Sequence, residues 1–116
     1  MKLHEWSKID REKLNPSCER QVIHCDQMTV ARLFLKKGAI VPRHSHLNEQ
    51  VTVLQEGKLR FAFDSADVIV EAGQALQIPG HEPHLVEALE DSVAMDLFSP
   101  VREDWVRGDD AYLRKS

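Results

Sequence analysis

Short runs of strand-forming residues, each ended by turn residues, constrain this 116-residue chain more than any other feature. None of these runs repeats apolar residues at the period of a helix. Evenly spaced short strands separated by turns are typical of an all-β sandwich or barrel. The sequence predicts seven strands, at residues 27–36, 50–55, 58–63, 67–71, 74–78, 84–89 and 93–98. We therefore expect an all-β jelly-roll barrel, with helix limited to a turn or two within 7–14 and 109–115.

Charge and composition indicate which binding partners are not expected and in which cellular compartment the protein acts. The formal net charge is −4 with 29% charged residues, so neither nucleic acid nor an anionic membrane surface is expected as a partner. Residues 1–6 lack the apolar core of a signal peptide, and the longest apolar runs are far shorter than a membrane span. We expect a soluble cytoplasmic protein in which Cys18 and Cys25 remain reduced.

Two histidines, His44 and His46, lie two positions apart in an extended segment. Residues two apart in a strand project to the same face, and neutral imidazole is the commonest protein metal ligand. A third histidine, His84, follows a loop with two prolines and a glycine, and it could return to the same place. An isolated His-x-His pair is more often a surface or core feature, but His84 and the all-β context favour a metal site.

Strand parity also indicates a fourth ligand. If the chain stays extended, Gln50 shares a face with His44 and His46, whereas Glu49 takes the opposite face. A bend at residues 47–48 would reverse this, so Glu49 remains the alternative. Three imidazoles and one amide would leave the full charge of the metal available as a Lewis acid. Imidazole suits zinc, copper, iron and nickel, so the sequence does not choose the ion.

A carboxylate within a predicted strand is a second chemical signal. Asp96 lies among apolar residues and shares a face with Phe98. A carboxylate inside a β-core is costly unless it is paired or used, and burial would raise its proton affinity, as general acid or base chemistry requires. The alternative places Asp96 on the solvated face, with Met95 and Leu97 in the core, and parity allows either arrangement.

An arginine follows the same strand after a short turn. Arg102 carries a planar fork of donors that could bind a carboxylate in a bidentate manner. It could equally pair with Glu103 or Asp104 at the surface. The sequence leaves both roles open.

Taken together, these residues resemble two motifs of the cupins. The first cupin motif has a glycine, a His-x-His pair, a Glu or Gln and a closing glycine, and it is matched by Gly38, His44, His46, Gln50 and Gly57. The second runs from a glycine through a proline to a histidine, and it is matched by Gly73, Pro79 and His84. His81 replaces the inner glycine of this second motif, which puts the shape of the loop in doubt. The resemblance implies a double-stranded β-helix, with residues 36–107 as its core, residues 1–35 as an extension and first strands packing on it, and residues 108–116 as a tail.

Within the cupins, the chain resembles the uronate-ketonising KdgF family of pectin degradation. The likeness lies in residues 38–46, 49–54 and 96–105. In that family a Gln is a metal ligand beside three histidines, so the resemblance gives Gln50 this role. It also gives Asp96 and Arg102 catalytic roles and places Phe98 and Arg102 against the substrate.

The resemblance implies an enzyme that opens the ring of an unsaturated monouronate, with one divalent ion (Zn, Ni, Fe or Mn) and no redox cofactor. The substrate would be a small carboxylated sugar. The protein would form a homodimer through edge strands, which need cover in any case. Two other functions remain open: a non-catalytic cupin that binds a sugar or metabolite, and a metal-dependent dioxygenase. Gln50 in place of a carboxylate makes the dioxygenase less attractive.

Overall fold

The computed structural model describes residues 1–114, in which two antiparallel sheets face each other. The larger sheet has the order β1-β2-β3-β10-β5-β8, with strands Glu12–Asn15, Cys18–His24, Thr29–Leu35, Ser92–Ser99, Glu49–Glu56 and Ala75–Ile78. The smaller sheet has the order β4-β9-β6-β7, with strands Ile40–His44, His84–Ala88, Lys58–Phe63 and Asp67–Glu71. The predicted all-β jelly roll is confirmed.

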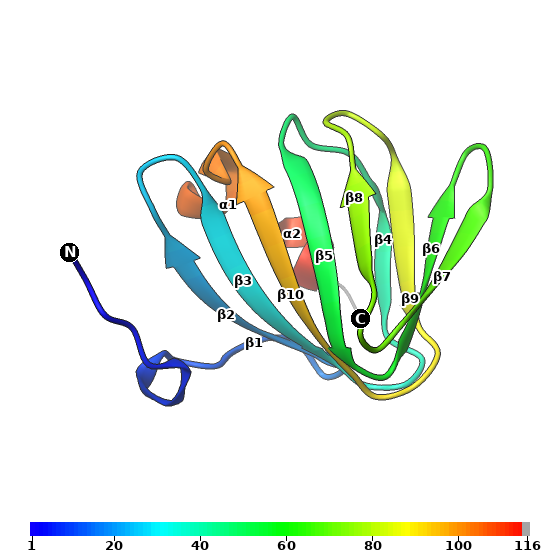
Figure 1. Ribbon diagram of the computed structural model, residues 1–116, viewed down its shortest axis with the longest axis horizontal. Helices are drawn as coiled ribbons and strands as arrows, with labels where there is room; N and C mark the ends of the chain where they lie inside the picture. The colour runs from blue at the N-terminus through cyan, green and yellow to red at the C-terminus, as the bar shows by residue number, and fades with distance from the viewer. Residues whose placement is uncertain (115–116) are drawn as a thin grey trace.

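Three short helical segments accompany the sheets: the 3₁₀ turn η1 (Trp6–Lys8), α1 (Glu103–Val106) and α2 (Ala111–Arg114). In Figure 1 both α-helices lie behind the larger sheet, on the side that faces the barrel interior. Helix α2 contacts β1 of the larger sheet and β4 of the smaller one, so it closes the gap between the sheets there. No helix within residues 1–114 is long and apolar enough to cross a membrane.

The core lies between the sheets because alternate strand residues point inward. Strand β10 is the centre of the larger sheet, and its Asp96 pairs with Ala31 of β3 on one side and Thr52 of β5 on the other. Apolar side chains from both sheets fill the interior, among them Leu54, Leu59, Phe61, Ile78, Val86 and Phe98. This frame holds a few inward-facing polar residues at fixed positions.

All seven predicted strands are present, but three further strands were missed for physical reasons. Strands β1 and β2 are rich in polar residues, and β2 buries Arg20 and Gln21 on opposite faces, so no alternation of apolar and polar residues marks it. Strand β4 contains Pro42, which the sheet tolerates because β4 lies at an edge.

The predictions for helix and for the cysteines were partly right. A helical turn is present within 7–14 only as the end of η1, and Glu12–Asn15 is a strand. The turn predicted at 109–115 is present as α2, although residue 115 lies outside the described residues. Helix α1 was not predicted. As expected, Cys18 and Cys25 are unpaired; the first is buried and the second exposed.

Candidate metal centre

The two cupin-like motifs bring three histidines to one place. His44 ends β4 and His84 begins β9, and the two are paired across these antiparallel strands. His46 follows in the loop after β4. One ring nitrogen from each of His44, His46 and His84 lies within 4.8 Å of the others, a spacing that could hold a metal ion. The predicted histidine cluster is therefore formed.

Each of these rings is oriented by its own backbone. The Nδ1 atoms of His44, His46 and His84 lie 2.8, 3.0 and 2.8 Å from the carbonyl oxygens of Pro42, Asn48 and Glu82 respectively. A carbonyl only accepts, so Nδ1 must carry the proton and Nε2 keeps its lone pair. Such partners fix the tautomer and aim of a metal-binding histidine.

Burial keeps the same imidazoles neutral. Desolvation lowers the pKa of His44 and of His46 to about 4, and it also lowers the pKa of His84. The hydrogen bonds from Nδ1 to the backbone oppose this shift without cancelling it. At neutral pH the cluster therefore offers three unprotonated nitrogens, which is the form that binds a metal.

Gln50, rather than Glu49, lies beside the histidines. Gln50 is only 4% exposed, and its Oε1 lies 3.0 Å from Nε2 of His46. Glu49 is exposed and accepts a hydrogen bond from Gln77 instead. The chain does bend at residues 47–48, and Gln50 faces the histidines because β5 begins at Glu49 and turns Gln50 and Thr52 inward. Whether Gln50 is a ligand remains a prediction.

A polar relay decides which end of the Gln50 amide faces the histidines. Its Nε2 donates to Oγ1 of Thr52 at 2.9 Å, and that hydroxyl donates to Oδ1 of Asp96 at 2.6 Å. Oε1 is therefore turned to His46, whose Nε2 is also an acceptor. Two acceptors 3.0 Å apart repel unless a cation lies beside them. The donor set therefore fits a bound metal ion.

Asp96 points into the interior and is 6% exposed, which answers the question that parity left open. Burial raises the pKa of Asp96 to about 6, although the hydrogen bond from Thr52 and the positive charge of Arg102 hold it lower than burial alone would. A carboxyl with this pKa exchanges protons readily near neutral pH.

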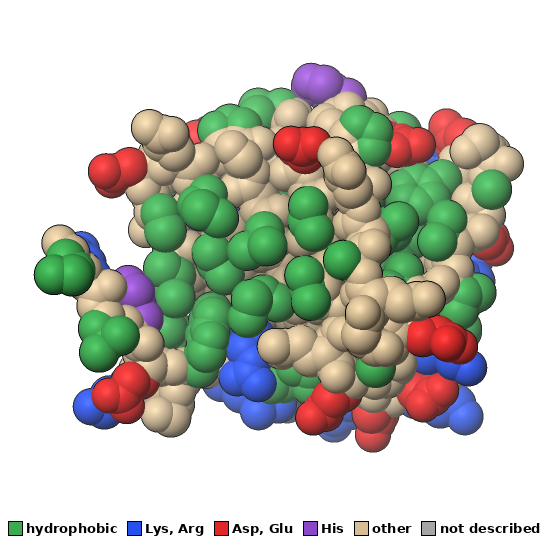
Figure 2. Space-filling view, viewed as in Figure 1, with side chains coloured by type: hydrophobic (Ala, Val, Ile, Leu, Met, Phe, Trp, Pro, Cys, Tyr) green, Lys and Arg blue, Asp and Glu red, His purple; other side chains and the backbone are tan. Residues whose placement is uncertain are grey.

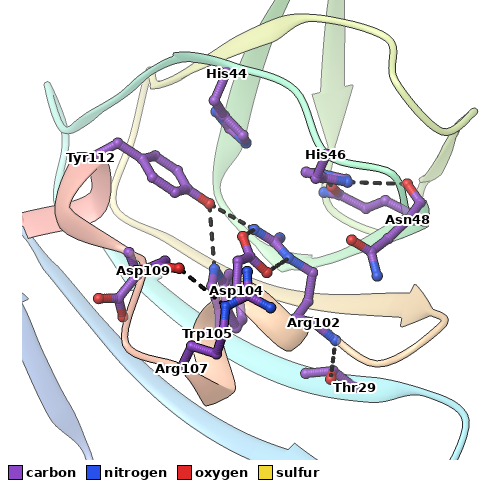
Figure 3. Close-up of polar contacts among 12 residues, drawn as sticks. Thr29, His44, His46, Asn48, Arg102, Asp104, Trp105, Arg107, Asp109 and Tyr112 are labelled. Carbon is purple, nitrogen blue, oxygen red and sulfur yellow. Dashed lines mark hydrogen bonds and ion pairs between the residues drawn. The ribbon is translucent and has the colours of Figure 1, made fainter.

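Of the two roles that the sequence left open for Arg102, the structure shows the pairing with Asp104, although in the interior rather than at the surface. Arg102 is buried, with 1% exposure. Its Nε and Nη2 donate to the two carboxylate oxygens of Asp104 at 3.0 and 2.8 Å, and Nη2 also donates to Oη of Tyr112 at 2.8 Å. The guanidinium carbon lies 4.7 and 4.2 Å from the ring centroids of Phe98 and Trp105. Figure 3 shows this arrangement beside His44 and His46.

Two of the histidines, His44 and His84, line one cavity of about 40 Å³ together with Gln50, Asp96 and Arg102, and two further polar residues of its lining were not predicted. Thr52 lines the cavity and links Gln50 to Asp96; its inward parity, the same as that of Gln50, could have revealed it. Tyr112 also lines the cavity, with its ring centroid 4.7 Å from that of His44. Asp104 is the partner that the sequence had offered for Arg102, whereas Tyr112 carries no local signal, since it reaches the site only because the chain turns back after β10.

His81, which replaces the inner glycine of the second motif, adopts a backbone conformation that is usual for glycine. His81 has a φ of 68°, the left-handed conformation in which a glycine is usual, and its N–H donates to the carbonyl oxygen of His46 at 2.7 Å. A Cβ on the neighbouring Gly80 would collide with the carbonyl oxygen of Leu47. The two motif loops therefore touch, and His84 enters the cluster as the motif requires.

Comparison with known protein families agrees with this site. The family model described as "Cupin domain" matches residues 31–99, more than half of the chain. The chain belongs to the cupin family. Three histidines from two motifs in a two-sheet barrel are the arrangement that the cupin resemblance implied. No curated protein matches the chain.

Solved structures extend the comparison. KdgF from a Halomonas species is similar, with a TM-score of 0.79 and 26% identity over 85% of this cupin and 94% of that chain. An RmlC-like cupin from Shewanella frigidimarina gives a TM-score of 0.82 at 24% identity, over 88% and 93% of the two chains. Oxalate decarboxylase of Bacillus subtilis is described with Mn(II) centres. It has a TM-score of 0.77 and 17% identity, over 85% of this chain and 29% of that chain. The predicted likeness to KdgF is confirmed.

Proposed function

We propose that this cupin is a metal-dependent enzyme that opens the ring of an unsaturated monouronate and releases its open-chain keto form. The observation that carries the proposal is that one cavity joins two of the clustered histidines, His44 and His84, to a buried carboxylate, Asp96, and a buried guanidinium, Arg102. The 26% identity to the Halomonas KdgF supports it. Such an enzyme would act in the cytoplasm, on monouronates released during pectin degradation.

The proposed ligands of the divalent ion, Zn, Ni, Fe or Mn, are His44, His46, His84 and Gln50. When bound, the ion would supply Lewis-acid polarisation of a sugar oxygen. The protein contributes the rest of the site: backbone carbonyls aim the imidazoles, and Thr52 turns the amide oxygen of Gln50 toward them.

The proposed role of Asp96 is to move protons. Ring opening removes the proton of the anomeric hydroxyl and breaks the bond from that carbon to the ring oxygen, which leaves an aldehyde and an enolate. The enolate then takes up a proton on carbon and becomes a ketone. Atoms and electrons balance without an oxidant or reductant. The carboxyl of Asp96, with a pKa of about 6, can accept the first proton and return one to carbon.

The proposed role of Arg102 is to bind the carboxylate of the sugar. Its Nε and Nη2 are held by Asp104 and Tyr112, whereas Nη1 has no hydrogen-bond partner within residues 1–114. The guanidinium is thus fixed in direction, with donors left for a substrate. Phe98 lies beneath it and would contact the sugar.

The size of the cavity adds one requirement. About 40 Å³ suffices for an ion and a water or two, and a sugar acid needs several times more. Tyr112 lies against His44 and lines the cavity, so this side chain would have to turn aside for the substrate.

The experiment uses the full-length protein loaded separately with Zn, Ni, Fe and Mn. Unsaturated galacturonate is added, and the loss of its ultraviolet absorbance is followed against buffer containing the same metal. We expect acceleration that Asp96→Asn abolishes while metal content is unchanged. No acceleration with metal bound would exclude this substrate. If the sugar binds without turnover, and Asp96→Asn binds it equally well, the protein is a binding module. Consumption of oxygen would instead indicate a dioxygenase.

A further inference from the structure

The loop that carries His46 contains one buried amide. Residues 45–48 connect β4 to β5, and in this loop Ser45 and Leu47 are exposed whereas Asn48 is only 2% exposed. A buried amide loses its hydrogen bonds to water, so protein groups normally replace them. The contacts of Asn48 therefore indicate what holds this loop in place.

The side chain of Asn48 joins the loop to the segment that leads to Arg102. Its Nδ2 donates to the carbonyl oxygens of Pro100 and Val101, at 2.5 and 3.3 Å, and these two residues connect β10 to Arg102 and α1. Strand β3 holds the same segment, because the N–H of Arg102 donates at 3.0 Å to Oγ1 of the fully buried Thr29. One side chain from the loop and one from β3 thus fix the backbone from which the guanidinium projects.

The backbone of Asn48 holds a histidine. Its carbonyl oxygen lies 3.0 Å from Nδ1 of His46 and accepts the hydrogen bond from that nitrogen. Figure 3 shows this contact, together with the hydrogen bond from Arg102 to Thr29. The two ends of one residue therefore hold two different functional groups.

His46 depends on such support more than the other two histidines do. His44 ends β4 and His84 begins β9, and the pairing of these strands fixes both. His46 lies outside any strand, and its own carbonyl oxygen accepts from the N–H of His81 at 2.7 Å. That bond holds the backbone of His46 but not its ring. The bond from Nδ1 to Asn48 sets the direction of the ring, and hence of Nε2.

We propose that Asn48 is a positioning residue that couples the metal centre to Arg102. Its carbonyl aims His46, and its amide ties the same loop to the turn that directs the guanidinium. A shift of this loop would therefore disturb the proposed metal ligand and the proposed carboxylate-binding group together. The consequence for the sugar rests on the proposed function, whereas the coupling of the loop to the turn requires no substrate.

The test compares Asn48→Ala with the matched control Gln21→Ala, both in the full-length protein. Nε2 of Gln21 also donates to two backbone carbonyl oxygens, those of Trp6 and Ile9, at 2.7 and 2.9 Å. Gln21 is buried as well, with 6% exposure, but it lies on the outer face of the larger sheet, away from the cavity. Figure 2 shows this outer face, on which hydrophobic side chains gather. Each variant removes one amide that bridges two carbonyls, so an effect of reduced stability alone should be similar in both.

The first measurement is zinc affinity, by competition with a chromophoric chelator. We expect Asn48→Ala to bind zinc about 10–100-fold more weakly than the wild type, as the loss of an orienting partner does, and Gln21→Ala to bind it unchanged.

The second measurement is the indole N–H signal of Trp105 in the proton–nitrogen NMR spectrum of the metal-free protein. This N–H and Nη2 of Arg102 donate to the same oxygen, Oη of Tyr112, so the signal reports on the position of the guanidinium. Asn48→Ala should shift the Trp105 signal, and Gln21→Ala should leave it in place. Trp6 is the other tryptophan, so Trp6→Phe assigns the two signals. In an active enzyme, Asn48→Ala should also raise the KM for unsaturated galacturonate roughly tenfold, because the hydrogen bond from Arg102 would be misaimed.

Three results would overturn the proposal: a folded Asn48→Ala that binds zinc as tightly as the wild type, an unshifted Trp105 signal in that variant, or an equal loss of zinc affinity in Gln21→Ala. An inactive wild type would contradict the proposed function alone, since neither zinc binding nor the NMR signal needs a substrate. Circular dichroism establishes folding. If Asn48→Ala does not fold, Asn48→Ser replaces it, because its hydroxyl has one donor and cannot bridge both carbonyls. The weaker zinc binding and the shifted signal are expected there too, and their absence would overturn the proposal.

Discussion

Replacing Thr52 by valine removes one hydroxyl and almost no volume, so it tests the polar relay directly. That hydroxyl accepts from Gln50 at 2.9 Å and donates to Asp96 at 2.6 Å, and both bonds are buried. Thr52→Val would leave an amide N–H and a carboxylate oxygen without these partners. At about 1–3 kcal/mol for each of these two buried groups, the free energy of unfolding should fall by roughly 2–6 kcal/mol.

The same substitution should weaken metal binding, because nothing would then turn the oxygen of Gln50 toward the histidines. Loss of an orienting partner typically costs about 10–100-fold in metal affinity. The assay is a zinc competition against a chromophoric chelator, with denaturant unfolding measured in parallel. Thr52→Ser keeps the hydroxyl and should bind zinc nearly as the wild type does. If folded Thr52→Val binds zinc as tightly as the wild type, the relay does not orient a ligand and the reasoning fails.

Three further predictions concern Arg102, the histidines and the thiols. Arg102→Lys keeps the charge but not the planar fork, so the proposed reaction should show a KM about tenfold higher or more, measured by initial rates. His44 and His46 bind fewer protons in the folded than in the unfolded state between about pH 6.5 and pH 4, so the metal-free protein should lose stability as pH falls through this window, by at most about 3 kcal/mol per histidine. The raised pKa of Asp96 offsets part of this loss below about pH 6. Urea unfolding at several pH values tests the prediction, and stability that rises as pH falls from about 6.5 to about 4 would contradict it. Burial raises the pKa of Cys18 to about 11, so iodoacetamide at pH 8 should alkylate exposed Cys25 first, as peptide mass mapping would show.

The sequence predicted those parts of the fold that leave a regular pattern of apolar and polar residues along the chain. The seven predicted strands alternate or run apolar between turns, and the same parity placed Gln50, and not Glu49, beside His44 and His46. Residues 47–48 bend, so the agreement does not come from a continuous strand; within β5, alternation turns Gln50 inward and Glu49 outward. The left-handed His81 shows why the loop keeps its shape although the expected glycine is missing.

The remaining parts depend on contacts between distant segments, which no local pattern carries. Arg102 was ambiguous because its burial is not set by the neighbouring Asp104 alone, and Tyr112 reaches it only when the chain folds back after β10. Parity could not choose between the two faces of β10, because both are apolar. The reason is visible only in the assembled sheet, where Asp96 faces the cavity and Met95 lies on the opposite face of the sheet.

The metal content of the protein, purified in full length without chelators, tests the central claim most directly. Elemental analysis should find about one divalent ion per chain. His46→Ala, which removes a partly exposed ligand, should retain far less metal while its circular dichroism is unchanged. A wild-type protein that holds none of Zn, Ni, Fe or Mn, and takes up none when they are supplied at neutral pH, would contradict the metal centre and every catalytic role derived from it.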